Sequence, residues 1–160
     1  MTKATPREDR MDRMGRDAFI ALYLVGNRFS EQLDRVCQAG GISHPQYSVL
    51  WVLCLSESAD GIAMGEIADG LLHRAADATR LVDRLVTAGL VSREPSPDDR
   101  RVVLVRPTAR GREVFESVTV GVKALHREQW KVLDEHELLE LTRLLNKALW
   151  GVASSSDGSP

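Results

Sequence analysis

Residues 85–94 read LVTAGLVSRE and residues 98–105 read DDRRVVLV, and these two runs decide the expected fold. Gly89 follows an apolar helical pattern and is placed to end that helix in a left-handed conformation. The runs at 90–93 and 102–106 are short and β-prone, and the charged, proline-containing residues between them favour a turn. The stretch therefore predicts a helix that leads directly into a β-hairpin.

The residues before this stretch predict two helices. Apolar residues recur at helical spacing between Phe19 and Cys37, and Gly40-Gly41 should end that helix. Ser43 is placed to cap the next helix, with Pro45 in its first turn and Gln46 completing a capping box. Its apolar residues are spaced at i, i+3, i+4 and i+7: Tyr47, Leu50, Trp51 and Cys54.

Two short amphipathic helices should follow the polar loop at residues 56–61. The first has Ile67, Ala68, Leu71 and Leu72 on its apolar face, and the second has Ala78, Leu81, Val82, Leu85 and Val86. After the hairpin, Thr108 is placed to cap a helix that runs towards Trp130. A last helix carries Leu138, Leu141, Leu145 and Leu149. This order predicts a mainly α protein with a small β-hairpin wing, a winged helix-turn-helix at residues 43–106.

Composition limits the class of protein. With 160 residues, 43% of them hydrophobic, the chain suits one globular domain at 1–160. The charged N-terminus has no secretory h-region, and the longest apolar run, Ala18 to Val25, is too short to span a membrane. Two cysteines are too few for a disulfide framework, so we expect a cytoplasmic protein with no membrane partner.

Charge is distributed unevenly along the chain. The net charge is −2, yet residues 74–112 hold 9 basic and 5 acidic residues, a local excess of +4. The second short helix should turn its apolar face inward, which leaves Arg74, Asp77, Arg80 and Arg84 outward, with Thr79 and Asp83 at the flanks. Arginines there can contact guanine edges or phosphates. The alternative is an ordinary amphipathic helix with a salt-bridged polar face.

The hairpin tip, Asp98-Asp99-Arg100-Arg101, carries two acids and two arginines. An arginine at such a tip can enter the minor groove of DNA, where narrow stretches concentrate negative potential. A neighbouring carboxylate would fix its guanidinium beforehand. The alternative is a solvated turn whose charges only aid solubility.

These motifs, and their order along the chain, resemble those of the MarR family (multiple antibiotic resistance regulators). The resemblance rests on residues 85–94, 98–105 and 108–111, with Pro45-Gln46-Tyr47 and residues 79–85 upstream. It implies a homodimeric regulator that binds double-stranded DNA at an inverted repeat. It also implies dimerisation helices at 8–40 and 108–152, in accord with the apolar residues near both chain ends, and we expect a disordered tail at 153–160.

The resemblance assigns roles to residues of the wing. Asp99 and Arg101 match its Asp-x-Arg pair, so Arg101 is the expected minor-groove residue and Asp99 its orienter. The expected DNA-binding set is Arg74, Asp77, Thr79, Arg80, Arg84, Arg93, Asp99, Arg100 and Arg101. Two departures from the family pattern are Pro107 and the run Arg74-Ala75-Ala76-Asp77, which lacks hydroxyls. Asp77 is also placed to pair with Arg80. A winged-helix protein with weakened DNA binding that acts through protein partners is therefore the alternative function.

Family members respond to small aromatic or phenolic ligands, and the expected action here is that of a repressor released by such a ligand. The residues expected to line the cleft are Tyr23, Asn27, His44, Tyr47 and Trp51. The alternative is that Tyr47 and Trp51 belong to the core.

Other chemistries find little support in the sequence. Phe19 stands where the hydroperoxide-sensing branch of the family has its cysteine, and Cys37 and Cys54 lie on apolar faces where thiols are usually inert. The four histidines show no metal-ligand spacing, and no phosphate loop or catalytic triad is present. We therefore expect no metal, no cofactor and no enzyme activity.

Overall fold

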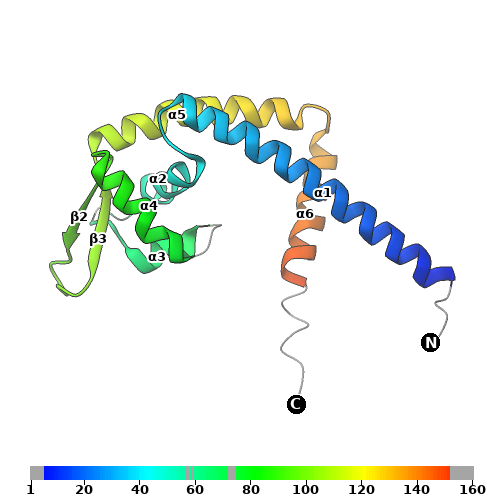
Figure 1. The fold of residues 1–160 in the computed structure, drawn as a ribbon, viewed down its shortest axis with the longest axis horizontal. Coiled ribbons are helices and arrows are strands. Elements are labelled where there is room, and N and C mark those ends of the chain that lie inside the picture. Colours follow the sequence, from blue (N-terminus) through cyan, green and yellow to red (C-terminus); the bar gives the residue numbers. More distant parts are fainter. Residues whose placement is uncertain (1–5, 57, 59, 72–74, 152–160) are drawn as a thin grey trace, which may run out of the picture. The chain divides into compact units, whose positions relative to one another are not determined.

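The computed structural model describes residues 6–56, 58, 60–71 and 75–151. Its elements, in chain order, are α1 (Pro6–Ala39), α2 (His44–Leu55), β1 (Ile62–Ala63), α3 (Met64–Gly70), α4 (Ala75–Thr87), β2 (Val91–Pro95), β3 (Val103–Pro107), α5 (Ala109–Trp130) and α6 (Glu135–Gly151) (Figure 1). The chain divides into two compact units, Met1–Lys123 and Ala124–Pro160. The expected mainly α fold with a small β wing is confirmed, whereas the expected tail at 153–160 lies outside the described residues.

The start of α2 forms as the sequence predicts. The Ser43 hydroxyl accepts a hydrogen bond from the Gln46 backbone N–H at 3.4 Å, and the Gln46 side chain accepts one from the Ser43 N–H at 2.9 Å. Both bonds of a capping box are present, with proline in the first turn. Gly41, with φ of +80°, precedes this start and ends the preceding turn.

The wing is part of a three-stranded antiparallel sheet of order β1-β3-β2. The predicted hairpin of β2 and β3 is confirmed, with Arg93 opposite Val105 in its register. The sequence did not predict β1, in which Ile62 pairs with Val105. A strand of two residues is too short to show the alternation by which strands are recognised.

The core of the first unit lies where α2, α3 and α4 meet the sheet and the first turns of α5. Side chains with no exposed surface include Val49, Leu50, Ile67, Val82, Leu85 and Val105. The predicted inner face of α4 is confirmed for Ala78, Leu81, Val82 and Leu85, but the prediction for Val86 is wrong because this residue is 39% exposed. Val86 lies one turn after Val82 and is rotated about 40° farther from Leu81 and Leu85, which places it at the edge of the buried stripe. Leu72 lies outside the described residues.

A compact junction joins α4, β2 and α5. Gly89, with φ of +69°, allows the Leu90 N–H to donate to the Leu85 carbonyl at 2.9 Å, which confirms the predicted helix end. Thr108 donates to the Gly89 carbonyl at 2.8 Å and accepts from the Gly111 N–H at 3.0 Å. Thr108 therefore caps α5 as predicted and also bonds to the turn that precedes the wing.

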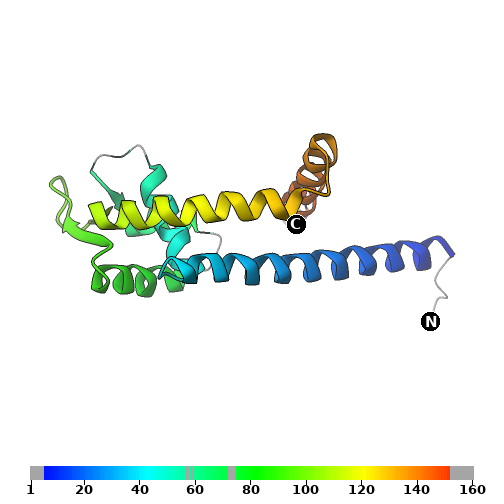
Figure 2. The same ribbon diagram turned by 90° about the horizontal axis from the view of Figure 1, so that it is seen from above.

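The N-terminal helix α1 begins at Pro6, well before the apolar helical spacing that starts at Phe19. Its last turns pack on α5, where Val36 lies against Gly121 and Gly40 against Val118. Its earlier part extends away from the winged-helix elements (Figure 2) and is exposed. Within the described residues, no helix combines the length and the apolar character that a membrane span requires.

Candidate DNA-binding site

Helix α4 presents a polar face opposite its buried stripe. Thr79, Arg80, Asp83 and Arg84 are all exposed. The helix therefore offers arginines to solvent while its apolar residues hold it against the core. Arg74 and the side chain of Asp77 lie outside the described residues, and so does the expected pair between Asp77 and Arg80.

The tip of the wing is a hydrogen-bonded turn. The Ser96 N–H donates to the Val102 carbonyl at 2.8 Å, and the Val102 N–H donates to the Asp99 carbonyl at 2.9 Å. A carboxylate oxygen of Asp99 accepts from the Arg101 backbone N–H at 2.9 Å. Asp99 thus orients the main chain of Arg101. No ion pair joins these two described side chains, so the expectation that Asp99 fixes the Arg101 guanidinium stays a prediction.

Arg100 and Arg101 are both exposed at this tip, on a turn that their own backbone holds in shape. Guanidinium groups in such a position keep their hydration until a partner arrives, and they can reach a phosphate or a groove floor. The arrangement suits a polyanion that extends past both α4 and the wing.

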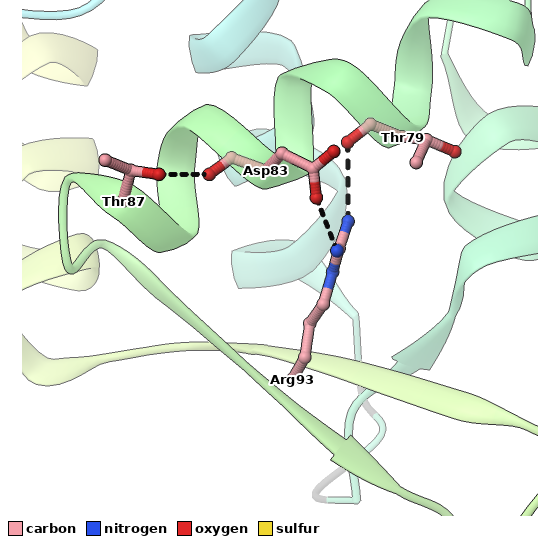
Figure 3. Close-up of polar contacts among 4 residues, drawn as sticks. All are labelled: Thr79, Asp83, Thr87 and Arg93. Carbon is pink, nitrogen blue, oxygen red and sulfur yellow. Dashed lines mark hydrogen bonds and ion pairs between the residues drawn. The ribbon is translucent and has the colours of Figure 1, made fainter.

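Arg93 differs from the other arginines in the expected DNA-binding set. Its guanidinium lies 2.5 Å from the Asp83 carboxylate and donates to the Thr79 carbonyl at 3.3 Å (Figure 3). The Arg93 side chain is 29% exposed, and its Nε is buried without a hydrogen-bond partner. Its contacts are therefore with α4, and no local pattern in the sequence indicates them because the partners lie 10 and 14 residues away.

Arg106 makes a second contact that the sequence did not predict. Its Nε donates to the Asp60 carbonyl at 2.7 Å, and its guanidinium lies 3.8 Å from the Asp60 carboxylate. The contact ties β3 to the loop before β1, where Gly61 has φ of +92°. It fixes the end of the sheet farther from the wing tip.

The structure divides the expected ligand residues between different places. Tyr47 is 7% exposed, stacks on Phe115 and shares a 3.2 Å hydrogen bond with the Thr119 hydroxyl, so it belongs to the core. Tyr23 is 59% exposed on α1, where it stacks on Phe19. Asn27 is also exposed on α1, and His44 is half-buried at the first turn of α2.

Trp51 is 48% exposed and lines a groove of about 480 Å³ between α2 and α5. The other lining residues are Leu55, Phe115, Glu116, Thr119, Val120 and Lys123. The α5 side of this groove is not predictable from local sequence, because α5 is distant from α2 in the chain. The groove has an aromatic wall, a hydroxyl and an ammonium group, a combination suited to a small aromatic acid or phenol.

The two thiols are not activated. Burial raises the pKa of Cys37 from 9.0 to about 11, with a smaller contribution from the negative charge of Asp34. Burial also raises the pKa of Cys54. A raised pKa keeps a thiol protonated and slow to react with oxidants. Among the residues with described placement, no three His, Cys, Asp or Glu side chains are grouped to hold a metal ion.

The fold and this site define a winged helix-turn-helix protein. Residues 40–102 match the model of the MarR family. The chain is 33% identical over 130 residues to the multiple antibiotic resistance protein MarR of Escherichia coli, covering 80% of this chain and 88% of that protein. It is 29% identical over 127 residues to the HTH-type transcriptional repressor IacR of Pseudomonas putida, covering 79% of this chain and 74% of that protein.

Solved structures agree with this assignment. A mutant MarR from E. coli complexed with operator DNA is similar with a TM-score of 0.74 and 30% identity, over 88% of this chain and 96% of that chain. CouR from Rhodococcus jostii, bound to p-coumaroyl-CoA, is similar with a TM-score of 0.72 and 26% identity, over 82% of this chain and 91% of that chain. The chain belongs to the MarR family of transcription regulators, and it is a regulator rather than an enzyme.

Proposed function

We propose that this chain is a homodimeric DNA-binding repressor that recognises a pseudo-palindromic operator. The observation that carries the proposal is the exposure of arginines on two neighbouring elements, Arg80 and Arg84 on α4 and Arg100 and Arg101 at the wing tip. A helix with this face suits the major groove, and a wing arginine suits the adjacent minor groove. The similar E. coli MarR forms a complex with operator DNA.

Dimerisation is supported by apolar surface within each unit. On α1, large hydrophobic residues are 43–67% exposed: Met11, Met14, Phe19, Ile20, Leu22, Tyr23, Leu24 and Val25. On α6, Leu139 and Leu149 are 65% and 64% exposed. So many large apolar side chains exposed on one helix are unfavourable in water and typical of an interface. A second copy of the chain would cover it and place two recognition helices about 34–36 Å apart, one turn of DNA.

Release by a small aromatic or phenolic ligand is the regulatory part of the proposal. The groove beside Trp51 supports this part of the proposal. Two similar proteins also support it: IacR is a transcriptional repressor, and CouR has been solved bound to p-coumaroyl-CoA. A ligand that binds better to a dimer with misplaced recognition helices would lower DNA affinity by linkage. Titration with p-coumarate should quench tryptophan fluorescence and release DNA. Trp51→Ala should lose both responses while still binding DNA.

The test of DNA binding begins with genomic fragments selected on the purified protein. The expected result is a short inverted repeat bound with an affinity that falls steeply as salt rises. Arg101→Ala should weaken this binding strongly while the dimer remains intact, and Arg80→Ala should change the sequence preference. Lys131→Ala removes the same charge from an exposed residue of the second unit and should leave binding unchanged. Weak, sequence-blind and nearly salt-independent binding would overturn the proposal in favour of protein partners.

A further inference from the structure

We propose that Asp83 and Arg93 are positioning residues that hold the wing at a fixed angle to α4, so that both elements reach DNA at once. The inference rests on the proposed DNA binding, and it assigns Arg93 a role other than the DNA contact expected from the sequence. The pair is formed before any DNA is bound, and it joins the two elements that the proposed complex uses.

The geometry makes this pair a bridge between elements. Thr79 and Asp83 are separated by one turn of α4, so the backbone carbonyl of one and the carboxylate of the other face the same side. The Arg93 guanidinium contacts both, at 3.3 Å and 2.5 Å (Figure 3). Two contacts from one planar guanidinium restrict its direction more than one contact would.

Arg93 is also the last residue of β2 whose side chain is not exposed. Val91 is 3% exposed and lies on the same face of the strand as Arg93, since alternate residues share a face. Beyond Arg93, Glu94 and Pro95 are exposed. The direction in which the wing leaves the core therefore depends on the contact that Arg93 makes with α4.

The pair is placed for positioning more than for overall stability. The Asp83 side chain is 55% exposed, and ion pairs that solvent reaches contribute only about 0–1 kcal/mol to folding. The start of β2 is already held by the Leu90 to Leu85 hydrogen bond and by the Thr108 tie to Gly89. β3 is tied to β1 and, through Arg106, to Asp60, and the Asp83–Arg93 pair adds a direct contact between β2 and α4 beyond that junction.

Asp83→Asn tests the proposal, because the two possible roles of Arg93 predict opposite changes in DNA affinity. If Arg93 were a phosphate ligand, removing Asp83 would free it and delete a negative charge near DNA, so binding would tighten. If the pair positions the wing, operator binding should weaken about tenfold, within the range seen for residues that act without touching ligand. Binding to a scrambled duplex of equal length, which needs only charge, should stay equal or tighten.

The experiment measures Kd for the selected operator and for the scrambled duplex by fluorescence anisotropy at two salt concentrations. Asp98→Asn removes a wing carboxylate without breaking an ion pair among the described residues, and it controls for charge alone. Arg93→Lys should retain part of the affinity, and Arg93→Ala should add little to Asp83→Asn in the double variant. Tighter operator binding by Asp83→Asn, or additive losses in the double variant, would overturn the proposal.

Hydrogen exchange provides a readout that does not depend on DNA. In Asp83→Asn, the amides of Ser96 and Val102, which close the wing tip, should exchange several-fold faster than in the unchanged protein, while those of α2 should not change. If the unchanged protein binds no duplex, the proposed function fails and this measurement still decides the role of the pair. Equal exchange in both proteins would refute it.

Discussion

Gly111 is the position where the smallest possible side chain should cause a large change. A Cβ atom built there would lie 1.9 Å from the Leu90 carbonyl oxygen and 2.9 Å from its carbon. Both are backbone atoms, so no side-chain rotation can relieve the contact. Leu90 is buried and directly precedes β2, and its carbonyl accepts a hydrogen bond from the Thr108 N–H at 3.0 Å. Gly111→Ala must therefore separate the first turn of α5 from the base of the wing.

The loss in free energy of unfolding can be estimated from the contacts that change. Reaching even a tight contact requires a shift of about 1.1 Å, and such overpacking costs about 1–3 kcal/mol. Loss of the Thr108 hydrogen bond adds about 0.5–1.5 kcal/mol, and a distorted Thr108 cap adds about 1 kcal/mol. Alanine regains about 0.5–1 kcal/mol over glycine within a helix. We expect the free energy of unfolding to fall by about 3 kcal/mol.

The assay is urea unfolding followed by circular dichroism, with all variants at one protein concentration because a dimer's stability depends on it. Gly65→Ala is the matched control, since it lies in α3 with nothing within 4 Å of its Cβ position, and it should be neutral or slightly stabilising. Gly111→Ala should also weaken operator binding, because it displaces the strand that leads to the wing. A loss below about 1 kcal/mol would refute the packing argument.

Two further predictions concern α2 and the core. Ser43→Ala should lower the free energy of unfolding by about 1 kcal/mol in urea denaturation, because the Gln46 N–H loses its side-chain acceptor; an unchanged value would mean that the capping box adds nothing. For Cys37, burial raises the thiol pKa from 9.0 to about 11, so the folded state holds this proton more tightly than the unfolded chain. Its contribution to stability is complete below pH 9 and is lost as pH rises towards 11. Cys37→Ala should accordingly show a shallower fall of unfolding free energy over that range, and equal slopes would contradict the pKa shift.

Local signals in the sequence predicted the elements of the fold well. The capping box at Ser43, the left-handed Gly89 and the Thr108 cap each depend on residues at most five positions apart, and all three are present. The hairpin followed from two β-prone runs around a turn. Such features are decided by backbone geometry that a few neighbouring residues impose, so they are visible before tertiary structure forms.

Features that depend on distant residues were not predicted. The pairing of Ile62 with Val105 joins β1 to β3 across the whole helix-turn-helix, and the Arg106 contact to Asp60 spans 46 positions. The groove beside Trp51 needs α5 as its second wall. Asp99 accepts from the Arg101 backbone N–H, a partner that the sequence did not predict, because a two-residue spacing suits a backbone N–H as well as a guanidinium.

Arg93 illustrates why charge alone is a poor guide to function in this molecule. Residues 74–112 carry an excess of basic charge, and the simplest interpretation is that every arginine in that stretch contacts DNA. The structure separates them by exposure: Arg84 and Arg101 face solvent, whereas Arg93 is turned towards Asp83 and Thr79. An arginine held by its own protein adds little attraction for a phosphate, yet it can determine whether the free arginines reach theirs together. Recognition of the major and minor grooves then depends on the Asp83–Arg93 pair, which contacts neither groove. Asp83→Asn should therefore reduce the difference in affinity between operator and scrambled duplex, and not DNA binding in general.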